Sequence, residues 1–425
     1  MPIDCFKDAP LEWPRKTIAE LAEIDPAYEL EDGRCYPFIE MASVQEGFGG
    51  ISKFDTRIWD RSGLCRFSEN DIILGKITPC AENGKTALVQ GLSYKYGIGS
   101  TEFFVLSPHA DVVPDFLFTL VTAGPFHRRL VSRMEGSTGR LRITRDTLKK
   151  WLAVPVPNLN EQRRIAAVLK LADDAIVKVK AELEAARELK QSLMQTLFIS
   201  GMPGRHSDFV ETKIGPVPKS WQVKQLGEVL VSSQYGLSES MAESGRFPIL
   251  RMNNIDNGMV NADDMKYIDL DDVTFKMFRL RAGDILFNRT NSMEYVGRVG
   301  IVNEDMDAVF ASYLVRLVAD TSQIDSWFLN FCLNSNQVKN RYRRYATPAV
   351  QQANINPRNL RKTLLAFPSL EDSDEQYEII ELFRSVDNSI ISLNQKVEAL
   401  LQVKKSLLQN LLTGKIRIPE GVLNV

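Results

Sequence analysis

The chain has 425 residues, of which 44% are hydrophobic and 25% charged, and its formal net charge at pH 7 is −2. This length exceeds what one ordinary core holds, so two or three globular domains are expected. No stretch approaches 18 uninterrupted apolar residues, which argues against a membrane span, and the near-neutral charge means that any affinity for nucleic acid must come from local patches.

The five cysteines are scattered without a C-x-x-C pair, and the three histidines share no metal-ligand spacing. We therefore expect reduced thiols, no metal site and a cytoplasmic location. The first residues, "MPIDCFKDAPLEWPRK", show no basic stretch followed by an apolar core, so a signal peptide is not expected.

Residues 1–157 are predicted to form a mixed α/β domain. Within it, the segment Arg128–Lys150 carries eight basic residues, among them Arg140 and Arg142, against two acidic ones. Basic side chains neutralise phosphates, so this segment is a candidate DNA contact, although a charge run is often only a solvated face. Weaker candidates follow the apolar run "DIIL": Lys76, Thr78 and Lys85.

Residues 158–201 are predicted to form one long helix. An apolar stripe with alternating steps of four and three residues runs from Ile165 to Leu197, which is the seam pattern of a coiled coil. The predicted seam includes Ile176, Val179, Leu183, Lys190, Leu193 and Leu197. Gly201 stands where a helix stop is expected, and the Gly- and Pro-rich residues 202–218 are predicted to be a linker.

Residues 219–370 are predicted to form a second mixed domain, with two candidate surfaces. In "GDILFNRTNSMEYVGRVGIV" (283–302), two strands flank a polar loop that offers Arg289, Thr290, Asn291, Ser292 and Arg298, although a hairpin with a solvated loop fits equally well. The segment Lys339–Lys362 contains seven basic residues and no acid. Its candidates for phosphates and base edges are Arg343, Arg344, Tyr345, Gln351, Gln352 and Asn354.

Residues 371–425 begin with a second long helix whose stripe has the same steps as the first. Its predicted seam includes Ile390, Leu393, Val397, Lys404, Leu407 and Leu411, and Gly414 stands at the expected stop. The matching registers favour pairing of the two helices with each other over packing of each on its own domain.

The chain is a tandem repeat. "LKQSLMQTL" (189–197) recurs as "VKKSLLQNL" (403–411), and four upstream segments also match in the same order with offsets of 208 to 214. Like surfaces on one chain satisfy each other most simply about a two-fold axis. The predicted fold is therefore α+β, with two tandem mixed α/β domains and two long antiparallel helices in a pseudo-two-fold coiled coil.

The predicted helix length suits a duplex. Residues 172–197 would span ~39 Å at the helical rise, and one turn of B-DNA separates half-sites by ~34–36 Å. Two readers could then touch one face of DNA about a turn apart.

Catalytic motifs are missing from the sequence. "NGKT" (83–86) lacks the first glycine of a phosphate-binding loop, no Pro-Pro-aromatic segment of an amino-methyltransferase occurs, and the acid pairs have no nuclease-like lysine pattern. We expect a non-catalytic chain.

The order of these parts resembles the specificity subunits of type I restriction–modification systems. "VPVPNLNEQRRIAAVL" (154–169), "GDILFNRTNS" (283–292) and "KKSLLQNLLTGKI" (404–416) are similar to motifs of that family. Two departures are three extra residues before Glu375 and "GKI" in the first copy where the second has "NRT".

The resemblance implies two target recognition domains, each reading half of a split DNA sequence. The helices would act as a ruler and dock two methyltransferase subunits, and restriction and translocase subunits would complete the assembly. No cofactor is expected on this chain, because S-adenosylmethionine and ATP would be used by partner subunits. Three alternatives remain at this point: a coiled-coil adaptor without a DNA role, a self-sufficient methyltransferase or nuclease, and the scaffold of a methylation-only system.

Overall fold

The computed structural model describes residues 2–137, 139–292, 294–348, 353–371 and 374–421. The chain packs into two compact units, and both long helices are divided between them. Unit 1 consists of residues 1–180 and 395–425, and unit 2 of residues 181–394. The predicted boundaries at residues 157, 201, 218 and 370 divide the sequence into consecutive domains, whereas the two units are defined by packing. These boundaries therefore stay a prediction.

The described residues of unit 1 form three small sheets and two short α-helices. The helices are α1 (Pro114–Thr122) and α2 (Gly124–Val131). The sheets, in strand order, are β1 (Ile3–Asp4), β11 (Leu152–Pro155), β2 (Arg15–Thr17); β3 (Ala22–Ile24), β10 (Phe103–Pro108), β7 (Ile72–Gly75), β8 (Thr86–Leu88); and β5 (Asp55–Ile58), β4 (Cys35–Ile39), β9 (Tyr96–Gly99), β6 (Cys65–Ser68).

In unit 2, the part of the chain that the structure describes forms four short α-helices and five sheets. The helices are α4 (Asp272–Phe278), α5 (Ser326–Asn334), α6 (Asn336–Arg343) and α7 (Pro357–Leu360). The sheets, in strand order, are β12 (Phe209–Thr212), β13 (Gly215–Pro218); β14 (Trp221–Gln225), β27 (Leu364–Pro368); β15 (Leu230–Tyr235), β24 (Leu314–Ala319), β20 (Ile285–Asn288), β22 (Val299–Ile301), β18 (Met259–Val260), β17 (Ile255–Asp256); β19 (Lys266–Ile268), β16 (Phe247–Leu250), β23 (Val309–Phe310); and β21 (Thr290–Asn291), β26 (Ala353–Ile355), β25 (Ala346–Pro348).

The sequence repeat is also a repeat of topology. The order β3-β10-β7-β8 in unit 1 recurs as β15-β24-β20-β22 in unit 2. The order β5-β4-β9 recurs as β19-β16-β23, and in each case the last two strands are parallel. The two mixed regions are therefore copies of one architecture, as the sequence predicted.

The predicted linker has more structure than its Gly and Pro content suggested. Within residues 202–218, β12 and β13 pair as an antiparallel hairpin. His206 reaches the buried carboxylate of Glu375, with 2.9 Å between its Nε2 and Glu375 Oε1. The Gly and Pro content, from which a linker was predicted, gave no sign of these partners.

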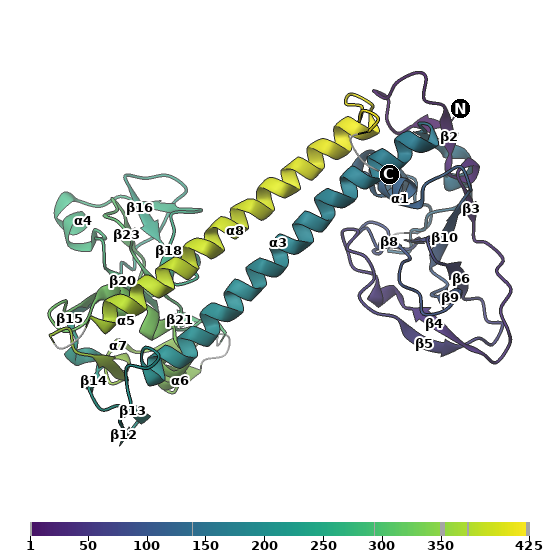
Figure 1. Cartoon of the computed structure of the whole chain (residues 1–425). Coiled ribbons are helices and arrows are strands. Elements are labelled where there is room, and N and C mark those ends of the chain that lie inside the picture. The colour runs from purple at the N-terminus through teal and green to yellow at the C-terminus, as the bar shows by residue number, and fades with distance from the viewer. Residues whose placement is uncertain (1, 138, 293, 349–352, 372–373, 422–425) are drawn as a thin grey trace. The chain divides into compact units, whose positions relative to one another are not determined.

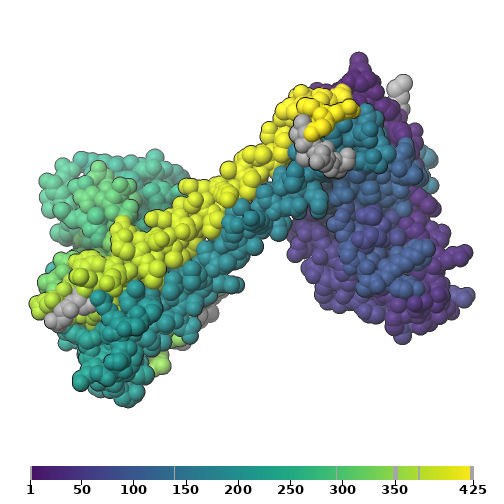
Figure 2. All heavy atoms as spheres, viewed as in Figure 1, coloured from purple at the N-terminus to yellow at the C-terminus, as the bar shows by residue number. Residues whose placement is uncertain are grey.

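The long helices are α3 (Leu159–Ser200) and α8 (Glu375–Leu412) (Figure 1). In unit 1 the first half of α3 packs against the second half of α8, with Ile165 and Leu169 in the same core as Leu411. In unit 2 the second half of α3 packs against the first half of α8, where the Phe198 and Phe383 rings stack at 5.7 Å. In both units the partners run antiparallel, and Figure 2 shows their surfaces in contact.

None of the twelve predicted seam residues is exposed. Five of them are buried, namely Ile176, Val179, Leu183, Leu197 and Leu411, and the other seven are half-buried. Both helices end at glycines with left-handed backbone, φ +70° at Gly201 and +62° at Gly414, a conformation that glycine adopts without steric cost.

A Lys–Asp pair interrupts the seam once in each unit. In unit 2, Lys190 Nζ lies 2.5 Å from Asp387 Oδ1, and both side chains are largely buried. In unit 1, Lys404 pairs with Asp173. The repeat offset of 214 relates Lys190 to Lys404 and Asp173 to Asp387. In each unit the lysine of one helix therefore pairs with an aspartate of the facing helix. A shift of one helix along the other would separate both pairs.

Buried amides fasten each long helix to its own mixed region. Gln162 Nε2 donates to Pro157 O at 3.0 Å, and its Oε1 accepts from Val113 N at 2.9 Å. Gln376 makes the equivalent bonds to Pro368 O at 2.7 Å and from Asp325 N at 2.9 Å. Each bond satisfies a buried backbone group, so the orientation of the helix on the domain is fixed by groups that are costly to leave unpaired.

We predict that Lys190→Glu lowers the free energy of unfolding by about 1–3 kcal/mol, because it places two carboxylates together in a largely buried seam. Adding Asp387→Lys should recover most of the loss, since the pair is then restored in reverse. Thermal and urea denaturation of the full chain measure this. The control is Lys178→Glu on the exposed face of the same helix, and equal losses for both single variants would contradict the proposed role of the pair.

Candidate nucleic-acid interface

In unit 1, the basic segment and the polar segment that the sequence singled out lie together. The backbone N–H of Ile143 donates to Lys76 O at 2.8 Å, and that of Thr78 donates to Leu141 O at 3.0 Å. This pairing places Arg140 and Arg142 beside Lys76 and Thr78. Arg142 is exposed and forms an ion pair with Glu102 at 3.0 Å, and Lys76 Nζ lies 5.1 Å from the centre of the Phe104 ring.

Unit 2 repeats this arrangement. The backbone N–H of Ile355 donates to Arg289 O at 2.8 Å, which is the counterpart of the Ile143–Lys76 bond. Strand β21 pairs antiparallel with β26, with Thr290 opposite Asn354. The polar loop and the basic segment, which the sequence analysis treated as two surfaces, are therefore one surface in each unit. We name them the unit 1 interface (Lys76, Thr78, Arg140, Arg142) and the unit 2 interface (Arg289, Thr290, Asn291, Asn354).

Arg289 is held in place by its neighbours. Its Nε donates to Ser312 O at 3.0 Å, its Nη1 donates to Asn354 Oδ1 at 3.2 Å, and its guanidinium lies 4.9 Å from the centre of the Tyr235 ring. Asn354 Nδ2 in turn donates to Thr290 Oγ1 at 3.2 Å. A fixed, half-buried guanidinium loses little freedom on binding, which suits it to planar recognition of a base edge or phosphate.

The turn before each interface strand is closed by a buried aspartate. Asp71 accepts from Ser68 N at 2.8 Å before β7, and Asp284 accepts from Arg281 N at 3.0 Å before β20. Burial raises the pKa of both carboxyls above the usual range. Asp71 of "NDII" and Asp284 of "GDIL" thus stabilise the turn that precedes the interface strand in each unit.

The remaining predicted DNA contacts are more scattered. Lys85 Nζ donates to Met41 O at 3.0 Å, Arg343 Nη2 donates to Glu294 O at 3.0 Å, and Tyr345 packs against the main core of unit 2. Arg344 is exposed at the end of α6, Arg298 lies 4.3 Å over the Tyr295 ring, and Ser292 is half-buried beside Asn291. Gln351 and Gln352 lie outside the described residues. DNA contact by these side chains stays a prediction.

Sequence reasoning missed three exposed aromatic residues near the unit 2 interface. Tyr235 lies under Arg289, Tyr295 lies under Arg298, and Tyr313 accepts the Arg289 N–H through its backbone oxygen at 3.0 Å. Tyrosines are effective contacts for nucleic acid because they combine a stacking face with a hydroxyl. Tyr235 is 54 positions before Arg289, so no local spacing linked the two.

Two further properties bear on the kind of site. In the part of the chain that the structure describes, no group of three or more His, Cys, Asp or Glu is placed to hold a metal ion. None of the described helices is long and apolar enough to cross a bilayer.

Comparison with known proteins identifies the family. The sequence model of the type I restriction modification DNA specificity domain matches twice, over residues 10–186 and 218–402. The chain therefore belongs to the family of type I restriction–modification specificity subunits, with one copy of the domain in each half.

Among its relatives is the MjaVIII specificity subunit of Methanocaldococcus jannaschii, 26% identical over 90% of this chain and 86% of the relative. The EcoAI specificity subunit of Escherichia coli is 30% identical over 52% of this chain. The chain spans only 35% of the EcoAI subunit and 49% of the MjaX subunit of M. jannaschii in those matches.

Solved structures share the fold. A chain from a structural study of complex assembly and conformational transition in a type I system superimposes with a TM-score of 0.58 at 18% identity, covering 96% of this chain and 99% of that one. The S subunit of a type I system from M. genitalium gives 0.57 at 15% identity, covering 94% and 96%. Two tandem mixed domains with a pair of long helices are thus the architecture of the family.

Proposed function

We propose that this chain is the DNA-recognition subunit of a type I restriction–modification complex. The observation that carries the proposal is the duplicated interface, with Lys76 and Arg142 in unit 1 and Arg289 and Asn354 in unit 2 held by equivalent backbone bonds. Two readers of like architecture suit a target with two halves. A coiled-coil adaptor without a DNA role is not favoured, because the DNA specificity domain model matches both halves of the chain.

Within this proposal the chain itself is non-catalytic. Methylation with S-adenosylmethionine and cleavage with ATP would be carried out by methyltransferase and restriction subunits that assemble on it in the cytoplasm. The relatives are named specificity subunits, which supports a division of labour in which recognition belongs to this chain.

The outer face of the helix pair supports docking of methyltransferase subunits. In unit 1, Val177 and Val403 are 67% and 51% exposed, and in unit 2, Ile391 and Leu189 are 54% and 52% exposed. The repeat offset of 214 relates Val177 to Ile391 and Leu189 to Val403. Exposed apolar side chains at matching places mark an interaction surface, and two such places suit two partner subunits.

Deleting the gene tests the proposal directly. We expect a set of methylated adenines that share one split sequence to lose their methylation when this gene is removed, and to regain it on complementation. A map of methylated adenines across the host genome measures this. An unchanged map, in a host whose methyltransferase genes are intact, would contradict the recognition role.

Arg289→Ala is expected to weaken recognition of one half of the target only, by about 1–3 kcal/mol, because Arg289 belongs to the unit 2 interface. Measuring methylation of targets with a base change in either half separates the two readers. The matched control is Arg142→Ala, which should affect the other half. Equal loss at both halves, or none, would contradict the assignment.

The proposed role of the helices as a ruler can be tested by lengthening both. Four residues inserted after Lys180 in α3 and four after Asn394 in α8 leave each Lys–Asp pair within its own unit and add ~6 Å of helix. We expect the gap between the recognised half-sites to change by about two base pairs. An unchanged gap in the methylation map of a folded variant would refute the ruler.

A further inference from the structure

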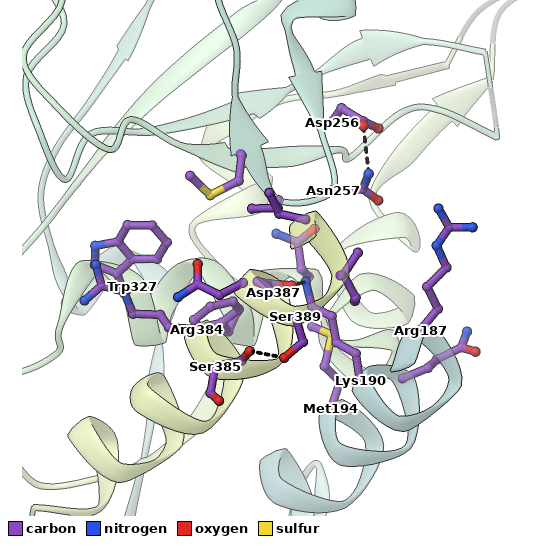
Figure 3. A pocket seen from close by; sticks show the side chains of 18 of the residues that line it. Arg187, Lys190, Met194, Asp256, Asn257, Trp327, Arg384, Ser385, Asp387 and Ser389 are labelled. Carbon is purple, nitrogen blue, oxygen red and sulfur yellow. Dashed lines mark hydrogen bonds and ion pairs between the residues drawn. The ribbon is translucent and has the colours of Figure 1, made fainter. Parts of the chain in front are cut away.

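Unit 2 contains a groove of about 1670 Å³ where the two long helices meet the mixed region (Figure 3). Residues of α3 and α8 form one wall, and Figure 3 shows Lys190 and Asp387 reaching each other there from facing helices. Asp256 and Asn257 lie across from them, and further lining comes from α5, α6, β18, β22 and the residues next to these strands. The proposed function assigns no ligand to this groove.

Most of the charges that line the groove are paired. Arg187 pairs with Glu184 at 2.6 Å, Lys190 with Asp387 at 2.5 Å, and Arg384 with Glu381 at 3.6 Å. Arg298 and Lys339 also line the groove. Of the carboxylates in the described residues, none lies within 4.0 Å of either cation, so neither side chain is ion-paired. Glu188 and Asp256 line the groove as carboxylates that are likewise outside the ion pairs of the described residues.

Lys339 is surrounded by positive groups. Burial and, in decreasing order, the charges of Arg343, Arg298 and Lys190 together lower the pKa of its ammonium to about 8. Arg343 is on the same helix, Arg298 follows the polar loop, and Lys190 comes from α3 with Asp387 of α8 opposite it. The charged form of a half-buried lysine among arginines is unfavourable unless an anion binds beside it.

This cluster is continuous with the unit 2 interface. The backbone N–H of Asn288 donates to Arg298 O at 2.8 Å, and Asn288 directly precedes Arg289. Arg343 donates to Glu294 O and so ties α6 to the same loop. The loop from residue 289 to residue 298 therefore carries the interface at its start and the cationic cluster at its end.

We propose that the groove of unit 2 binds a backbone phosphate of DNA against Arg298 and Lys339, next to the duplex segment that the unit 2 interface reads. The inference rests on the proposed function, because it takes DNA as the source of the anion. A phosphate at this place fixes the register of the recognition domain on the duplex without reading a base.

Binding at this site is coupled to proton uptake. A phosphate stabilises the charged form of Lys339 and raises its pKa in the complex, so the complex binds more protons than the free chain once the pH passes about 8. The affinity for DNA then falls as the pH rises through that range. We expect about a five-fold loss between about pH 7 and about pH 9, since one proton taken up changes the affinity by at most about ten-fold per pH unit.

The test uses the full chain, purified through an affinity tag from its host together with the subunits that co-purify. The probe is a random-sequence duplex about three helical turns long, and fluorescence anisotropy gives the affinity at constant ionic strength. Lys339→Arg keeps the charge at every pH and should flatten the pH dependence. Lys339→Met and Arg298→Gln should each weaken binding and reduce the salt slope by about 1. The matched control is Lys276→Met, which removes an exposed lysine of α4 outside the groove.

The outcomes separate this inference from the proposed function. Wild-type chain that binds no duplex at any salt concentration contradicts both. Wild-type chain that binds DNA while Lys339→Arg keeps the same pH dependence, or while Lys339→Met matches Lys276→Met, contradicts only the groove. A third result also overturns the phosphate proposal. If polyglutamate binds the wild-type chain but not Lys339→Met, and Lys339→Met keeps the wild-type affinity for DNA, the groove is assigned to a carboxylate of a protein partner. Thermal melts of the variants identify any that fail to fold.

Discussion

The antiparallel pairing of α3 with α8 is the constraint on which the rest of the structure depends. Each helix contributes its first half to one unit and its second half to the other, so neither mixed region is completed by a helix of its own. The apolar seam supplies the attraction, but attraction between Leu, Ile and Val side chains is tolerant of a shift by one heptad. The Lys190–Asp387 and Lys404–Asp173 pairs remove that tolerance, because a shifted seam would leave charges in a largely buried place without partners.

The same logic extends outward from the helices. Gln162 and Gln376 bind backbone groups of the neighbouring domain, and each sits within the first turn of its helix. In each mixed region the interface follows a strand, β7 or β20, and a buried aspartate stabilises the turn before that strand. Within each unit, the helix register, the orientation of the mixed region on the helices and the position of the interface loop are therefore linked through short contacts with named partners.

Much of the fold was predictable because its strongest signals are periodic or repeated. The seam spacing gave both long helices, and the repeat gave two mixed domains whose strand orders proved equivalent. The candidate site was less accessible. Arg289 and Asn354 are 65 positions apart, and only β-pairing brings them together, so the sequence showed two basic or polar surfaces where the fold has one. Tyr235 and the Lys339 cluster depend on tertiary packing, and a pattern of single residues does not encode such contacts.

The interleaving of the two units has a consequence for how the protein is made. Unit 2 is one continuous stretch, residues 181–394, and it can finish packing soon after it leaves the ribosome. Unit 1 cannot, because residues 395–412 are synthesised after all of unit 2, and Leu411 and Leu412 belong to the same core as Ile165 and Leu169. Unit 1 is thus begun before unit 2 and completed after it, and the apolar face of the first half of α3 stays uncovered while unit 2 is synthesised.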